Sequence, residues 1–162
     1  MTQAPSLSPG DALPALDIET TRGKASFQDF LGHQLVIYFY PKDDTPGCTV
    51  EGQDFTRLHG EFLAADTQVL GVSRDSLSSH QKFIDKFQFS LTLVADTSER
   101  ICQAFGVMKD KNMYGKVVRG IERSTFLFDA QGTLRQVWRG VKVPGHAQDV
   151  LDAARTLSNR SE

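Results

Sequence analysis

The sequence has few cysteines and lacks long hydrophobic runs. Its 162 residues include only Cys48 and Cys102, and no Cys-x-x-Cys pair. Two cysteines do not make the disulfide framework of a small secreted protein, and the absence of that pair excludes a motif for a redox-active dithiol. The longest apolar run, residues 35–40, is far too short to cross a bilayer. Residues 1–10 lack the basic and apolar regions of a secretory signal, so we expect a cytoplasmic protein without a membrane partner.

Charge and metal-ligand patterns exclude further classes of protein. Lys and Arg number 18 and Asp and Glu 20, a net charge of −2, so no basic excess exists to bind nucleic acid. The four histidines are dispersed and no glycine-rich phosphate loop occurs. We therefore expect no metal and no cofactor.

Composition and length predict one globular domain. Hydrophobic residues make up 40% of the chain and charged residues 23%, which is ordinary for a folded protein. A chain of this length buries roughly 70% of the surface that it exposes when unfolded. We expect a single domain over residues 1–162, with its core at about residues 9–157.

The hydrophobic pattern predicts an α/β fold with a mixed central sheet flanked by helices. Pro5, Pro9 and Pro14 favour an extended start, and residues from Ser158 onward are expected to fray. One hairpin is predicted from residues 15–19 and 24–26, and another from residues 124–129 and 134–139. Residues 108–120 are predicted to form a surface loop or a short strand pair. Further strands are predicted at 35–40, 69–73 and 91–95, a helical turn at 27–31, and helices at 48–65, 76–87, 98–105 and 146–157, with Ser76 and Ser98 as N-caps.

Cys48 is the strongest candidate for a reactive residue. It follows a buried strand and a polar turn, and it lies where a helix is predicted to begin. Free backbone N–H groups and the positive end of the helix dipole favour the thiolate there, and the thiolate is the nucleophilic form. The competing interpretation is an inert buried thiol at a helix start.

Some residues near Cys48 in the sequence favour its thiolate form, and others disfavour it. The Thr45 hydroxyl is within reach of the thiolate or of an oxygen bound beside it. Asp43 and Asp44 oppose the thiolate, so a cation is needed. Lys42 and Arg123 are the candidates, and Arg123 is preferred because its planar fork binds two acceptors at once.

Other assignments of the cysteines are weaker. Cys102 shares an amphipathic helix with Ile101 and Phe105, which favours a packed thiol over a partner for Cys48. Residue 54 is Asp, so the Cys-x5-Arg loop of a cysteine phosphatase is missing. A Cys–His hydrolase is a remaining alternative for the function of Cys48, although the sequence points to no particular histidine as its general base.

The segment Tyr40-Pro-Lys-Asp-Asp-Thr-Pro-Gly-Cys-Thr-Val-Glu51 contains the pattern Pro41-x-x-x-Thr45-x-x-Cys48. This pattern resembles the active site of peroxiredoxins, in particular the bacterioferritin comigratory protein (PrxQ) subfamily. The resemblance extends from about residue 9 to residue 157 and includes Gly71-Val-Ser-Arg-Asp75, Arg123-Ser-Thr-Phe-Leu-Phe-Asp129, Val137-Trp-Arg and Val143-Pro-Gly-His146.

The resemblance implies a thioredoxin-like fold with an N-terminal hairpin extension and a thiol-dependent peroxidase without a cofactor. It implies that Cys48 attacks the peroxide and becomes a sulfenic acid. Thr45 and Arg123 would hold the two peroxide oxygens. Pro41 would shield the sulfenic acid, and Glu51 would orient the arginine.

The sequence departs from the subfamily at the resolving cysteine. Many members carry it five residues after the peroxidatic cysteine, where this chain has Gln53, and others near the position of Ile84. We therefore favour a one-cysteine mechanism in a monomer, with thioredoxin, or glutathione and glutaredoxin, as the external thiol. The alternatives are that Cys102 resolves Cys48, or that the protein is a non-enzymatic redox sensor or holdase.

Overall fold

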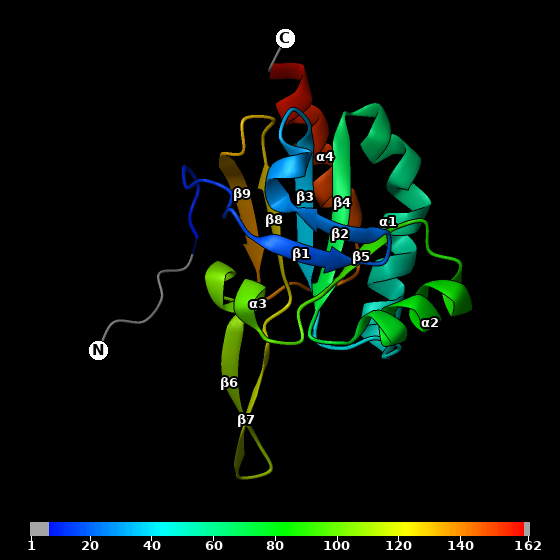
Figure 1. Cartoon of the computed structure of the whole chain (residues 1–162), viewed down its shortest axis with the longest axis vertical. Coiled ribbons are helices and arrows are strands. Elements are labelled where there is room, and N and C mark those ends of the chain that lie inside the picture. The colour runs from blue at the N-terminus through cyan, green and yellow to red at the C-terminus, as the bar shows by residue number, and fades with distance from the viewer. Residues whose placement is uncertain (1–6, 161–162) are drawn as a thin grey trace.

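A central mixed sheet organises the computed structural model, which describes residues 7–160 (Figure 1). Its seven strands are β1 (Asp17–Thr20), β2 (Gly23–Ser26), β3 (Gln34–Phe39), β4 (Thr67–Ser73), β5 (Thr92–Ala95), β8 (Ser124–Phe128) and β9 (Leu134–Arg139). They lie in the order β2-β1-β5-β4-β3-β8-β9, with β3, β4 and β5 parallel and the outer strands antiparallel. The predicted α/β architecture is confirmed.

Helical segments cover both faces of this sheet. They are η1 (Phe27–Phe30), α1 (Pro46–Ala64), α2 (Leu77–Phe87), α3 (Arg100–Phe105) and α4 (His146–Arg160). Residues of α1, α2 and α4 share one hydrophobic core, and residues of η1 and α3 share a second. Among the helices within residues 7–160, none combines the length and apolar character that a membrane span requires.

The central strand β3 explains why there are two cores. All six of its residues are buried. Val36 and Tyr38 belong to the core beneath α1, whereas Leu35, Ile37 and Phe39 belong to the core beneath α3. Because successive side chains of a strand point to opposite faces, an unbroken apolar run is what a strand covered on both faces requires.

A separate hairpin projects from the body of the molecule. It consists of β6 (Met108–Met113) and β7 (Lys116–Ile121), which pair only with each other. Figure 1 shows it at the opposite end from the C-terminus. Of the two alternatives for this segment, a loop or a strand pair, the structure shows the strand pair.

Several predicted boundaries are corrected. Helix α1 begins at Pro46, two residues before Cys48. Helix α3 begins after Glu99 and not at Ser98, because the carboxylate of Asp96 accepts the N–H groups at its start. Helix α4 continues to Arg160, so the predicted fraying at residue 158 is wrong, and residues 161–162 lie outside the described residues.

Other local predictions hold. The Ser76 side chain caps α2 by accepting the Ser79 N–H. Both predicted hairpins are present. The described start of the chain makes a turn at residues 8–11 and then runs beside the start of β9, with Ala12 bridged to Thr133, so the predicted extended start holds only after the turn. Pro5 lies outside the described residues.

The sheet brings two distant segments to one edge. Phe39, the last residue of β3, pairs with Ser124, the first residue of β8. The loop after β3 therefore lies beside Arg123, which immediately precedes β8. The ends of adjacent strands at such an edge are where α/β folds commonly place their sites.

Candidate active site

Cys48 lies in the first turn of α1. Thr45 is the N-cap residue, and the first hydrogen bond of the helix runs from the Thr49 N–H to the Thr45 carbonyl at 2.9 Å. The N–H groups of Gly47 and Cys48 come before it, so they are not used within the helix. The Cys48 side chain is almost entirely buried. The expectation of a thiol at a helix start is confirmed, and the positive end of the helix dipole faces it.

Arg123 joins the thiol to a buried carboxylate. Its Nη2 donates to Cys48 Sγ at 3.4 Å, and its Nη1 donates to Glu51 Oε1 at 2.6 Å. Glu51 lies one helical turn after Cys48, so both acceptors present themselves on the same side of α1. The planar guanidinium can serve both at once. The contact is with Arg123 and not with the other candidate cation, Lys42, which is exposed.

Gly47 makes room for this guanidinium. A Cβ atom on Gly47 would lie 3.2 Å from Arg123 Nη2. That distance is tighter than ordinary van der Waals contact, so a side chain there would push the guanidinium. The sequence analysis did not connect Gly47 with Arg123, because 75 residues separate the cysteine from its arginine partner.

Burial sets the electrostatics of the Glu51–Arg123 pair. Burial raises the pKa of Glu51 to about 7, although Arg123 opposes the rise. Burial alone would lower the pKa of Arg123, but Glu51 and Cys48 outweigh it and raise the pKa. The guanidinium is therefore held in its charged form. Within the described residues, Glu51 Oε2 is buried with no hydrogen-bond partner.

Thr45 and Pro41 lie in the segment that precedes Cys48. The Thr45 hydroxyl donates to the Lys42 carbonyl at 2.8 Å. Its proton is therefore committed, and its oxygen remains an acceptor for an O–H group. This differs from a hydroxyl that donates to the thiolate, one of the two roles that the sequence suggested. Pro41 lies two residues after the end of β3 and is half-buried.

The acidic residues of the loop are engaged elsewhere. Asp43 is buried, and it accepts hydrogen bonds from the Tyr40 hydroxyl at 2.6 Å and the Ser79 hydroxyl at 2.8 Å. Asp44 pairs with Lys86 of α2 at 2.8 Å. The expected opposition of these carboxylates to the thiolate is thus balanced by partners on the side of α2.

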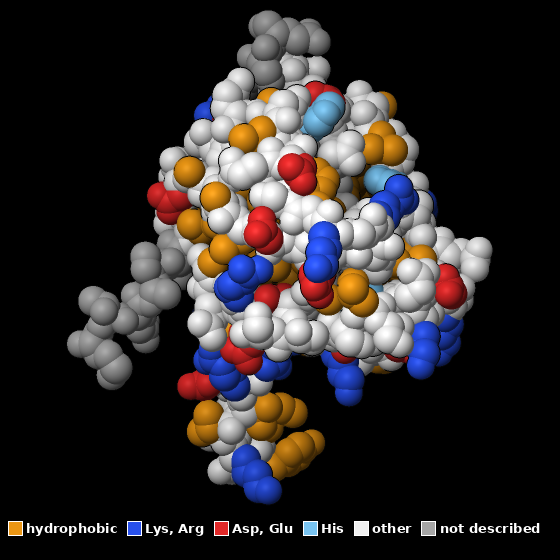
Figure 2. Space-filling view, viewed as in Figure 1, with side chains coloured by type: hydrophobic (Ala, Val, Ile, Leu, Met, Phe, Trp, Pro, Cys, Tyr) orange, Lys and Arg blue, Asp and Glu red, His pale blue; other side chains and the backbone are white. Residues whose placement is uncertain are grey.

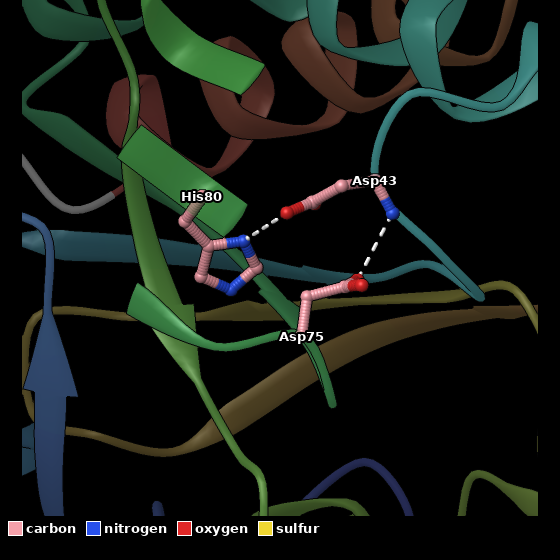
Figure 3. A group of neighbouring side chains, drawn as sticks. All are labelled: Asp43, Asp75 and His80. Carbon is pink, nitrogen blue, oxygen red and sulfur yellow. Dashed lines mark hydrogen bonds and ion pairs between the residues drawn. The ribbon is translucent and has the colours of Figure 1, made fainter. Parts of the chain in front are cut away.

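A buried histidine completes the anchor of this loop (Figure 3). His80 Nδ1 lies 2.7 Å from Asp43 Oδ2, and its Nε2 lies 2.9 Å from the Val94 carbonyl, to which it must donate. The Asp43 N–H donates to Asp75 Oδ2 at 2.9 Å. Asp43, Asp75 and His80 thereby tie the loop before Cys48 to β4 and α2.

These three residues are also the group in residues 7–160 with the spacing of metal ligands. Asp43 Oδ2 and His80 Nδ1 already bond each other, and Asp75 Oδ2 accepts the backbone N–H of Asp43 and the Ser73 hydroxyl. The three residues therefore fit an anchor better than a metal centre. The sequence analysis missed His80 because its partners Asp43 and Val94 are 37 and 14 residues away, without a recognisable spacing.

Cys102 lies on the other face of the central sheet from Cys48. It belongs to the core beneath α3, whereas Cys48 belongs to the core beneath α1 and α4. It is fully buried, and burial together with the neighbouring Asp96 raises the pKa of its thiol well above the usual value. Of the two positions that carry a resolving cysteine in relatives of the subfamily, Gln53 is exposed and Ile84 packs against the first core.

Comparison with known proteins identifies the family. The model of the AhpC/TSA family matches residues 9–137. This chain belongs to the AhpC/TSA family. Among curated members, it is 59% identical to peroxiredoxin Bcp of Xanthomonas campestris over 76% of this chain and 78% of the relative. It is 42% identical to peroxiredoxin Bcp of Bacillus subtilis over 94% of this chain and 96% of the relative.

Solved structures of the AhpC/TSA family agree in sequence and fold. The bacterioferritin comigratory protein of Xanthomonas campestris, studied for alkyl peroxide reduction, matches with a TM-score of 0.86 and 49% identity over 91% of this chain and 99% of that one. A PrxQ variant of Xylella fastidiosa matches with a TM-score of 0.88 and 40% identity over 98% and 99%. The predicted peroxiredoxin resemblance and thioredoxin-like fold are confirmed, and the protein is a thiol-dependent peroxidase.

Proposed function

We propose that Cys48 is the peroxidatic cysteine and that it works without a resolving cysteine in the same chain. The single observation that carries the assignment of Cys48 is the 3.4 Å hydrogen bond from Arg123 Nη2 to Cys48 Sγ. Glu51 holds the same guanidinium by accepting from its Nη1. A charged, oriented guanidinium beside a thiol at a helix start favours the attacking thiolate.

The first half-reaction oxidises the thiol. The Cys48 thiolate attacks one peroxide oxygen, so that an S–O bond forms as the O–O bond breaks. The departing oxygen takes a proton and leaves as water or an alcohol, and Cys48 becomes a sulfenic acid. Arg123 stabilises the negative charge that develops on the oxygens, and Thr45 Oγ1 accepts a hydrogen bond from the peroxide O–H.

Both hydrogen peroxide and alkyl hydroperoxides are proposed substrates. The reaction needs only an O–O bond within reach of the sulfur, and the solved Xanthomonas campestris relative concerns alkyl peroxide reduction. Pro41, in the loop after β3, is proposed to limit access of water to the sulfenic acid.

The second half-reaction uses an external thiol. A reductant thiolate attacks the Cys48 sulfur, which releases water and forms a mixed disulfide. A second thiol then releases Cys48 and yields an oxidised disulfide. The separate cores of Cys48 and Cys102 support this route, because a disulfide requires Cα atoms within about 7 Å. Thioredoxin, or glutathione with glutaredoxin, in the cytoplasm is the proposed source, and the working unit is proposed to be a monomer.

Peroxide consumption in the presence of excess dithiothreitol tests the proposal. Cys48→Ser is expected to abolish turnover, and Cys102→Ser to leave it intact. Arg123→Lys keeps the charge but loses the fork, and we expect a fall of about 100-fold in the rate of peroxide reduction. Arg119→Lys, an exposed arginine of the nearby hairpin, is the matched control. Full turnover by Cys48→Ser would overturn the assignment of the cysteine.

A further inference from the structure

The projecting hairpin of β6 and β7 has one face that combines lysines with apolar side chains. Met113 pairs with Lys116, and Lys111 pairs with Val118. Directly paired residues share a face, and so do alternate residues along a strand. The face therefore carries Lys109, Lys111, Met113, Lys116 and Val118, with no acidic residue among them.

The tip of the hairpin concentrates exposed apolar surface. Tyr114 is 99% exposed and Val117 is 72% exposed, and Met113 and Val118 are each nearly half exposed. These four are half of the eight large hydrophobic side chains that are exposed in residues 7–160, yet they fall within six consecutive positions. Figure 2 shows them at the lower end of the molecule beside basic side chains. Clustered exposed apolar groups mark interaction surfaces.

Tyr114 is not explained by the stability of the hairpin. It occupies the two-residue turn with φ 54°, followed by Gly115 with φ 79°. Asn, Asp and Gly are preferred at such left-handed turn positions, and a bulky residue there costs free energy. Because the ring is almost fully exposed, it gains little from packing within the chain. A tyrosine at this position fits contact with another molecule.

Charge on the hairpin opposes that of the rest of the molecule. Residues 108–121 hold four basic side chains and one acidic side chain, which is +3, so the remainder of the chain carries −2 − 3 = −5. Lys109 pairs with Glu122, and Arg119 pairs with Glu99. Lys111 and Lys116 form no ion pair with any residue that the structure describes. They remain available to an acidic surface.

We propose that this hairpin docks the protein on an anionic lipid membrane. An aromatic ring, neighbouring aliphatic groups and flanking lysines form the composition that inserts at the boundary of headgroups and acyl chains. A narrow projecting ribbon needs no complementary partner shape to enter a bilayer surface, whereas a protein interface buries about 800 Å² on each side. Lysines along both free edges disfavour strand pairing with a second copy.

This proposal revises the expectation of no membrane partner. That expectation rested on the lack of a spanning segment, which does not bear on surface docking. The hairpin leads directly to the active-site edge, since β7 ends at Ile121, two residues before Arg123. Docking therefore turns that edge of the sheet toward the membrane. The proposal does not depend on the peroxidase mechanism.

Flotation of the reduced full chain with vesicles tests the docking. We expect the protein to float with vesicles of phosphatidylglycerol and phosphatidylcholine, not with phosphatidylcholine alone, and to be released by high salt. Lys111→Gln combined with Lys116→Gln should lower partitioning about 30-fold, since each lysine near the surface contributes about 1 kcal/mol. Lys24→Gln combined with Lys82→Gln removes the same charge from exposed positions outside the hairpin and should leave partitioning unchanged.

Tyr114→Asn separates docking from folding. The variant should bind the anionic vesicles more weakly while its Tm stays the same or rises, because Asn suits the left-handed turn. Failure to float with anionic vesicles, or an equal loss in the lysine control, overturns the proposal. A Tyr114→Asn variant that instead raises KM for a protein thiol reductant, or changes the oligomeric mass, without loss of vesicle binding would also overturn it and assign the hairpin to a protein partner.

Discussion

Cys48 and Cys102 lie in two separate hydrophobic cores on opposite faces of the central sheet. A disulfide between them would require one of the two cores to open. Burial also raises the pKa of the Cys102 thiol, which leaves little thiolate to attack a sulfenic acid. The structure thus supports a peroxidase whose second thiol comes from another molecule.

A long-lived sulfenic acid follows from this separation. Without a resolving thiol nearby, the Cys48 sulfenic acid is expected to meet a second peroxide and advance to sulfinic acid. Treatment with a large excess of hydrogen peroxide before reductant is added should inactivate the enzyme, and peptide mass spectrometry should find two added oxygens on Cys48. Unchanged activity after such treatment would contradict this expectation.

Gly47→Ala tests the space beside the guanidinium. The added methyl group would lie 3.2 Å from Arg123 Nη2 and displace it from Cys48 Sγ. We expect a fall of about tenfold in the rate constant for peroxide, since that is roughly 1.4 kcal/mol of lost transition-state stabilisation. Gly60→Ala in the same helix is the control, because a Cβ there meets nothing within 4 Å. Equal rates for the two variants would show that the contact with Arg123 does not matter.

His80→Ala tests the anchor of the active-site loop. The change leaves the buried Asp43 carboxylate without its ring partner and the Val94 carbonyl without a donor. We expect a loss of about 3–5 kcal/mol in the free energy of unfolding, measured with urea. The exposed His33–Asp66 pair, with a 2.6 Å contact, provides the control. His33→Ala should cost about 1 kcal/mol at most, and similar losses for both variants would argue against the anchor.

His146 gives the stability a defined dependence on pH. Burial lowers the pKa of His146 from 6.5 to about 4, although Asp149 opposes the shift, and Arg123 lowers it slightly further. Below pH 6.5 the unfolded chain binds a proton that folded His146 does not bind until about pH 4. The free energy of unfolding therefore falls as pH drops from 6.5 to 4, by up to about 3 kcal/mol.

His146→Gln should remove this fall. Glu51 acts in the opposite direction, because its pKa is raised from 4.5 to about 7 and its protonation favours the folded state as pH drops through that range. Since Glu51 is present in both proteins, the difference between them isolates His146. Urea unfolding at pH 7 and at pH 4.5 measures it, and parallel losses of stability in the two proteins would contradict the assignment.

Local signals in the sequence were enough to predict the strands, most helices and the position of Cys48. An unbroken apolar run predicts β3, and the polar turn after it predicts a helix that begins near Cys48. The helix begins two residues earlier, because Pro46 suits the first helical position. The start of α3 could not be predicted from Ser98, because Asp96 competes for the same N–H groups and Glu99 takes a left-handed φ of 64°.

Contacts between distant segments were harder to predict. The pairing of Arg123 with Cys48 was inferred from chemistry and resemblance, but the role of Gly47 in admitting the guanidinium depends on the register of β3 with β8. The bonds of Asp43 with His80 and Asp75 depend on how α2 packs against β5, which no sequence spacing reveals. The separation of Cys102 from Cys48 likewise depends on which face of the sheet α3 covers.

The intact mass after oxidation tests the central claim most directly. The reduced protein is treated with one equivalent of hydrogen peroxide without reductant, and the modified residue is mapped. The account predicts a gain of one oxygen on Cys48 and an unchanged Cys102. A loss of two hydrogens, with a peptide linking Cys48 to Cys102, would contradict it and show that the chain resolves its own sulfenic acid.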